Sequence, residues 1–377
     1  MTATVAAAMP PPAGSVSLHQ YPAAARPRRT LSGGGASSLS HSPSPSAVPA
    51  GDGTDNSDGL KYLHLRPPPH LVDRAARELG ETDARRSAGL SRLVAAQHEA
   101  AAAAVAAARS APGTGVGGGR DGSPPAVARF RTALAADPVF LLAFLRVAKF
   151  RPAAAAARID RFAALVEAEP WASLPSVPQL LRVYSHGALG LTDTYDRAGR
   201  RMVTVSGAKL VSLLDDAGMG ALKQVGFWAF VALTRQPEVA ICGVVLVQNM
   251  GGAGVGLLRH LRGPEMSAWW GLAQHVLPLR LRGIYITAAP SYMGFAWTVV
   301  RKFLSPKVRD RVVLLGKDPA ALHKVVDLDH LPVEVGGRRQ RDEAYAMSVV
   351  VGGLRDTKWM VLSHDAEAAM REYCRGR

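Results

Sequence analysis

The sequence has few cysteines and few carboxylates for its length. Two cysteines, Cys242 and Cys374, lie far apart among 377 residues, so neither a disulfide framework nor a metal-binding cysteine pair is expected. Cys242 stands in an apolar run, which predicts a buried thiol in a reducing compartment. The sequence has 45 Lys and Arg residues but only 30 Asp and Glu residues, which gives a net charge of +15. That charge suits nucleic acid, an anionic membrane or an acidic protein equally well.

Long hydrophobic runs are missing as well. The apolar run from Val225 to Leu233 lies between Lys223 and Arg235. It has about half of the ~20 residues that a membrane-spanning helix needs. Any contact with a membrane is therefore expected to be peripheral.

Signatures of catalysis and of nucleotide binding are missing too. His275, His323 and His330 have no carboxylates at metal-ligand spacing, and the sequence has no Gly-x-Ser-x-Gly elbow. The glycines at 251–256 lack the third glycine of a dinucleotide fingerprint and the Gly-Lys-Ser/Thr of a phosphate loop. No basic and aromatic residues alternate as in nucleic-acid modules. We expect no enzyme activity, metal, cofactor or nucleic-acid partner.

The first part of the chain divides into a tail and a helical lobe. Residues 1–60 are rich in Ala, Pro, Ser and Gly, which predicts a disordered tail. The first acidic residue is Asp52, so an organellar transit peptide is the alternative. From about 68 to 190, apolar residues recur at helical spacing, which predicts an all-α lobe with a Gly-rich insertion near 110–125.

Strands and helices alternate from about 191 to 345. This order is typical of an α/β domain with a mostly parallel sheet covered by helices. The strands are expected at 201–206, 239–247, 282–288 and 311–315. One or two helices are expected at 209–233, and one each at 257–276 and 291–304. Residues 346–377 are expected to form a C-terminal extension.

The helix expected at 291–304 carries one bulky apolar stripe. The stripe consists of Met293, Ala296, Trp297, Val300, Phe303 and Leu304. These residues alone fit either a core helix or a mobile cover over a pocket. A short helix capped by Ser305 should follow, with Lys307 and Arg311 on one face. That face suits an anionic membrane, or it is simply solvated.

Several stretches together resemble the CRAL-TRIO family of lipid-binding domains. Its second half is similar to residues 277–316, LPLRLRGIYITAAPSYMGFAWTVVRKFLSPKVRDRVVLLG, and 330–337, HLPVEVGG. Its N-terminal motif FLRARKF is similar to FLRVAKF at 144–150, and its first strand region to YDRAGRRMVTVSGA at 195–208. The resemblance covers about 68–345 and is nearest to the tocopherol-transfer, retinaldehyde-binding and clavesin branch.

The resemblance implies the CRAL-TRIO fold, in which an all-α lobe precedes a mostly parallel sheet with helices and a lid helix. The ligand would lie between the sheet and the lid, which falls on 291–304 here. The implied ligand-binding residues are Leu272, Leu277, Leu281, Ile284, Met293, Trp297, Val300, Phe303 and Leu304. The implied phosphoinositide-binding residues, expected to point to water, are Arg280, Lys307, Arg309 and Arg311, with Arg282 nearby.

Several features depart from the family pattern, among them Gly252 in place of a bulky residue and the Gly-rich insertion before Pro125. Glu334 replaces the headgroup-binding Lys of the phosphatidylinositol-transfer branch, and Gln248 replaces an acidic residue. Ala148 replaces an Arg, for which the adjacent Lys149 could substitute. These departures argue against assigning one specific lipid.

The resemblance thus implies a cytoplasmic monomer that binds a small hydrophobic lipid and transfers it between membranes. It would dock peripherally on phosphoinositide-containing membranes. The alternative is a lipid-sensing regulatory adaptor without transfer activity. A liposome transfer assay separates the two hypotheses, because an adaptor binds lipid without accelerating its transfer.

Overall fold

The computed structural model describes residues 62–110, 124–169, 172–260, 264–317, 319–355 and 357. The predicted tail at 1–60, most of the Gly-rich insertion and the end of the C-terminal extension lie outside the described residues, as does Cys374. Within the described residues, no helix combines the length and the apolarity needed to cross a bilayer.

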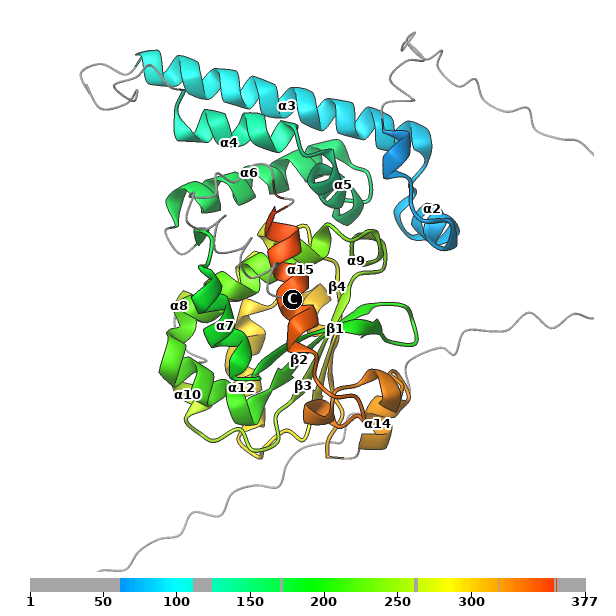
Figure 1. The fold of residues 1–377 in the computed structure, drawn as a ribbon, viewed down its shortest axis with the longest axis vertical. Helices are drawn as coiled ribbons and strands as arrows, with labels where there is room; N and C mark the ends of the chain where they lie inside the picture. The colour runs from blue at the N-terminus through cyan, green and yellow to red at the C-terminus, as the bar shows by residue number, and fades with distance from the viewer. Residues whose placement is uncertain are drawn as a thin grey trace, which may run out of the picture. The chain divides into compact units, whose positions relative to one another are not determined.

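The first half of the described chain is helical. Its helices are α2 (Val72–Leu79), α3 (Asp83–Ser110), α4 (Ala126–Ala135), α5 (Pro138–Val147), α6 (Pro152–Ala168) and α7 (Val177–Ser185). Helix α3 packs along α4 (Figure 1). Proline begins both α5 and α6, where its missing N–H costs no hydrogen bond. Phe140 and Phe144 of α5 meet Phe162 of α6 edge to face, and these rings join the two helices.

A five-stranded sheet forms the second half. Its strands, β1 to β5 in spatial order, are β1 (Leu189–Tyr195), β2 (Arg201–Ser206), β3 (Val244–Asn249), β4 (Leu281–Thr287) and β5 (Val312–Leu314). β1 pairs antiparallel with β2, and the other neighbours pair in parallel. The predicted fold class, a mostly parallel sheet behind a helical lobe, is confirmed.

The helices and short turns around the sheet follow in chain order. They are α8 (Gly207–Thr234), α9 (Pro237–Cys242), α10 (Leu257–His260), α11 (Pro264–Gly271), the π-helix η4 (Leu272–Val276), α12 (Met293–Val300), the 3-10 helix η5 (Arg301–Phe303), α13 (Pro306–Arg309), α14 (Pro319–His323), the 3-10 helices η6 (Leu328–His330) and η7 (Val333–Val335), and α15 (Glu343–Arg355).

Residues alternate between the two faces of the sheet, as a strand requires. One face carries Leu246 and Ile284 toward α8, α11 and α12. The other carries Val245 and Tyr285, which pack on α14 and the segments after it, among them Val335. Because both faces are covered, β3 begins with four successive apolar residues, Val244 to Val247.

Two of the predicted elements are wrong in detail. The strand expected at 239–247 begins only at Val244, because residues 237–242 form helix α9. Pro237 begins that helix, and Gly243 ends it with a φ of 87°. A Cβ at Gly243 would also lie 2.3 Å from the carbonyl oxygen of Arg280. The single helix expected at 257–276 consists of α10, α11 and the π-helix, with 261–263 outside the described residues.

The remaining differences concern the limits of predicted helices and the elements that were not predicted. Strand β1 and helices α14 and α15 were not predicted. Helix α8 includes the helices expected at 209–233 and is interrupted at Gly218, which has a φ of 79°. The helix expected at 291–304 is α12 followed by the 3-10 turn η5.

Candidate functional site

A cavity of about 200 Å³ lies between the sheet and helices α8, α11 and α12. The sheet supplies one wall. Its lining side chains are Leu189, Leu191, Val203, Val205, Leu246, Gln248, Ile284, Ile286, Val312 and Leu314. The helices supply the opposite wall, with Leu210, Leu214, Met219, Leu222, Ala229, Phe230, Met266, Trp269, Trp270, Met293, Ala296, Trp297, Val300 and Leu304 among their lining residues. The cavity is therefore apolar on both sides.

Polar side chains are rare in this lining. Of the described lining residues, none is Lys, Arg, Asp or Glu. His260 faces Asp215, with 3.3 Å between Nε2 and Oδ1. Burial raises the pKa of Tyr184, so that its phenol stays neutral. Gln248 adds one amide group on β3. The cavity thus offers hydrogen-bonding groups but few charges.

The structure brings most of the predicted ligand-binding residues to this region. Ile284, Met293, Trp297, Val300 and Leu304 line the main cavity. Leu272, Leu277 and Leu281 line a smaller one of about 20 Å³, which shares Phe230, Leu246, Trp269 and Trp270 with the main cavity. Phe303 lines neither of these two cavities.

Hydrogen bonds hold the expected lid helix α12 at both of its ends. The hydroxyl of Tyr292 donates to the carbonyl oxygens of Ala253 and Gly254 at 2.8 and 3.0 Å. At the other end, Gln274 Nε2 donates to the carbonyl oxygen of Phe303 at 2.9 Å. The backbone N–H of Ser305 donates to Gln274 Oε1 at 2.6 Å. The glycine-rich loop after β3 therefore anchors the lid.

The π-helix that carries Gln274 is tied to the helical lobe. Arg158 of α6 donates to the carbonyl oxygens of Leu277 and Gln274 at 2.5 and 2.7 Å. Arg161 donates to that of His275 at 2.9 Å. Burial, and then the charge of Arg161, lower the pKa of Arg158 to about 10, so that it remains a cation at neutral pH.

The predicted phosphoinositide-binding residues differ in exposure. Lys307 is exposed, while Arg309 and Arg311 are half-buried. The Arg280 side chain is only 7% exposed and lies 3.0 Å from Glu78, so the prediction that it points to water is wrong. Arg280 also donates to the carbonyl oxygen of Ile241, and Arg311 to that of Leu281. These backbone contacts fix both guanidinium groups in place.

Like charges nevertheless gather around Lys307. Its pKa is lowered by burial first, and then by repulsion from Arg311, Lys149, Arg280 and Arg282. Burial also lowers the pKa of Arg311, followed by repulsion from Arg282. Lys149 has a φ of 52°, a left-handed conformation that is uncommon for residues with a side chain. The structure thus brings together a basic cluster, which we define as Lys149, Arg280, Arg282, Lys307 and Arg311.

Three groups of site residues were missed by sequence reasoning. One is the cavity wall from α8. The helical spacing of apolar residues around Leu214 indicated a buried helix face, but it did not indicate that this face lines a cavity. Another is the wall from β1 and β2, for which the alternation in 201–206 was a usable signal. The third comprises the two lid anchors, Tyr292 and Gln274, for which the sequence held no local signal.

Comparison with known proteins finds one matching family model. Residues 185–337 match the CRAL/TRIO domain. Proteins with this domain generally bind or transfer lipids. The matched range contains the whole sheet, α12 and the basic cluster apart from Lys149. The domain limits expected from the sequence, 191–345, stay a prediction.

Individual relatives are distant. Clavesin-1 of Rattus norvegicus is 24% identical over 213 residues, which are 54% of this chain and 58% of that protein. Clavesin-2 of Homo sapiens is 27% identical over 222 residues, covering 54% and 63%. The match thus spans about three fifths of these relatives' length. The crystal structure of Sfh5 covers 78% of this chain and 96% of its own at 12% identity, with a TM-score of 0.40, too low to support an argument.

Proposed function

We propose that this CRAL/TRIO protein is a non-enzymatic carrier, which binds one small, uncharged lipid in the main cavity and transfers it between membranes. It would act as a monomer on the cytoplasmic side and dock peripherally on phosphoinositide-containing bilayers. The apolar cavity beneath α12 carries this proposal. A phosphate or carboxylate would find no cationic partner among the described lining residues, and an unpaired charge in an apolar site is costly.

Burial of apolar surface supplies the driving force. A ligand that buries ~400 Å² of apolar surface would gain on the order of 10 kcal/mol before costs, at ~25 cal/mol per Å². Immobilising the ligand and the lid offsets part of this gain. Opening of α12 would expose its inner face, and that exposure is least costly where lipid replaces water.

Native mass spectrometry of the purified full chain, followed by lipid extraction, tests the binding step. A fluorescent-lipid transfer assay between donor and acceptor liposomes tests the transfer step. A bound neutral lipid together with accelerated transfer supports the carrier. A bound lipid without transfer would favour the lipid-sensing adaptor. Absence of any bound or bindable lipid would overturn the proposal.

The basic cluster is expected to attract anionic lipid, through the exposed Lys307 and the half-buried Arg311. Changing Lys307 and Arg311 together to Gln should weaken binding to phosphoinositide liposomes by about 2 kcal/mol, since each such charge contributes about 1 kcal/mol near the surface. That is roughly thirtyfold, and the difference should shrink as salt rises. Co-sedimentation with liposomes measures it.

The matched control changes Arg77 and Arg92 to Gln. Both are exposed on the helical lobe, so the variant loses the same net charge away from the cluster. Equal weakening in the two variants would show that only the total charge matters. Ligand affinity in solution and the melting temperature of each variant confirm that the fold is retained.

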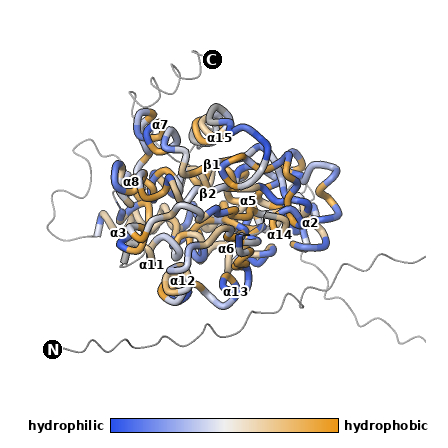
Figure 2. The backbone as a smooth tube through the Cα atoms, turned by 90° about the horizontal axis from the view of Figure 1, so that it is seen from below, coloured by the Kyte–Doolittle hydropathy of each residue, from blue (hydrophilic) through white to orange (hydrophobic). Residues whose placement is uncertain are grey.

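Phe295 on α12 is expected to enter the bilayer. Its side chain is 53% exposed, and Figure 2 shows α12 at the periphery in the pale to orange colours of hydrophobic residues. Phe295→Ser should slow lipid transfer about tenfold, because a fully buried Phe contributes about 1.5–3 kcal/mol. Ligand affinity in solution should not change. Val333→Ser, at a similarly exposed residue of η7, serves as the control. An unchanged transfer rate for Phe295→Ser would place membrane entry elsewhere.

A further inference from the structure

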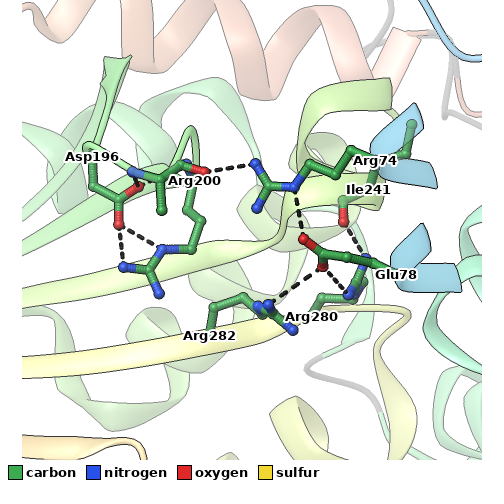
Figure 3. A network of polar contacts seen from close by, with 8 residues as sticks. Arg74, Glu78, Asp196, Arg200, Ile241, Arg280 and Arg282 are labelled. Carbon is green, nitrogen blue, oxygen red and sulfur yellow. Dashed lines mark hydrogen bonds and ion pairs between the residues drawn. The ribbon is translucent and has the colours of Figure 1, made fainter. Parts of the chain in front are cut away.

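A carboxylate from the helical lobe lies among three arginines (Figure 3). Glu78 of α2 accepts a hydrogen bond from Arg74 Nε at 2.9 Å through its Oε1. Its Oε2 lies 3.0 Å from Arg280 Nη2 and 3.3 Å from Arg282 Nη2. The two residues from β4 and its start thus meet a residue some 200 positions earlier in the chain.

The charges at this point are unequal. Three guanidinium groups share one carboxylate, and Lys307 and Arg311 add to the positive potential. Arg200 is nearby but has its own partner, Asp196, at 2.5 Å. Burial raises the pKa of Glu78, but attraction by Arg282, Arg74 and Arg280 outweighs burial, so the pKa lies below its usual value. Glu78 is therefore ionised at neutral pH.

We propose that Glu78 competes with phosphate for Arg280 and Arg282 of the basic cluster and for the adjacent Arg74, and that a bound phosphate group displaces its carboxylate. This inference rests on the proposed docking to phosphoinositide membranes and adds a regulatory step to it. The ligand chemistry is a phosphomonoester, carried by a lipid headgroup or by a soluble molecule.

Charge and geometry support the exchange. Guanidinium groups bind carboxylate and phosphate through the same paired N–H donors. A phosphomonoester carries a charge of about −1.5 to −2 and three acceptor oxygens, so it satisfies three arginines better than one carboxylate does.

Exposure decides which partner can leave. The Glu78 side chain is 28% exposed, whereas that of Arg280 is 7% exposed and is held by the carbonyl oxygen of Ile241. Glu78 can therefore turn toward water while the arginines stay in place. Phosphate can bind only the molecules in which Glu78 has left the arginines. The apparent affinity for phosphate therefore equals the affinity of the open site multiplied by the fraction of molecules in which the site is open.

The test compares the wild-type full chain with Glu78→Gln and with Glu99→Gln. Glu99 is exposed on α3, so both variants gain the same net charge. Binding is measured to phosphatidylcholine vesicles with and without a phosphatidylinositol bisphosphate, to soluble inositol hexakisphosphate and to inorganic phosphate. Glu78→Gln should bind the phosphate probes at least about fivefold more tightly, the lower end of usual coupling between sites. Adding Arg74→Gln to Glu78→Gln should cancel the gain.

The outcomes separate this inference from the proposed function. Wild-type docking with no gain in Glu78→Gln, or an equal gain in Glu99→Gln, would overturn the competing role of Glu78 and leave docking intact. A gain for the soluble probes alone would support the site and contradict lipid docking. If no form of the protein binds any phosphate probe, both proposals fail. If Glu78→Gln does not fold, Glu78→Asp keeps the charge but shortens its reach, and the same gain is expected.

Discussion

Replacing Trp297 by Asp should weaken binding of a hydrophobic ligand by about a hundredfold or more. Trp297 lines the main cavity from α12. The substitution removes an aromatic wall and places a carboxylate in an apolar site without a described cation in the lining. A loss of about 2.8 kcal/mol corresponds to a hundredfold change in the dissociation constant. Fluorescence titration with the lipid recovered from the purified protein measures the loss.

Thr298→Asp is the matched control, because the next residue of the same helix is exposed. It introduces the same charge on the outer side of α12, so affinity in solution should stay within about twofold of the wild type. If Trp297→Asp binds as the wild type does, α12 does not cover the ligand.

Glu81→Gln should lower the free energy of unfolding by about 3–5 kcal/mol, as expected when one partner of a buried ion pair is lost. Glu81 is almost completely buried between two buried arginines of the helical lobe. Its carboxylate accepts from Arg86 Nη1 at 3.0 Å and from Arg146 Nε and Nη2, both at 3.0 Å. Glutamine keeps the size but leaves Arg146 without its counter-charge. Urea unfolding followed by circular dichroism measures the change.

An exposed ion pair provides the comparison. Asp327 pairs with Arg197 on the surface, with both side chains about half exposed. Asp327→Asn should therefore change the unfolding free energy by less than about 1 kcal/mol. A similarly small effect of Glu81→Gln would mean that water reaches the buried arginines and replaces the carboxylate.

The sequence predicts best those elements that follow one local rule. Strand 201–206 was predicted at its observed limits, because apolar residues alternate there. The apolar stripe of α12 correctly indicated which side of that helix faces inward, and Met293, Trp297 and Val300 line the cavity. Because strands and helices alternate along the chain, a mostly parallel sheet was predictable without knowing which strands pair with each other.

Local rules fail where residues compete or lie far apart. Val239 and Ile241 favour a strand, but Pro237 and Gly243 place them in a helical turn instead. The burial of Arg280 follows from its contact with Glu78, a residue 202 positions away, which no local pattern contains. The lid anchors depend in the same way on contacts between segments that are distant in sequence.

Arg158 and Arg161 donate hydrogen bonds to residues inside the segment that matches the family model. These bonds limit how far that segment can be exchanged as a separate module. The carbonyl oxygens that they reach belong to residues 274, 275 and 277, inside the matched range, whereas both arginines precede residue 185. Glu78, which pairs with Arg280 and Arg282, precedes it too. The segment that matches the family model is thus shorter than the part of the chain that these contacts hold together. An engineer who exchanges lipid specificity between relatives would have to transplant α2 and α6 together with the sheet.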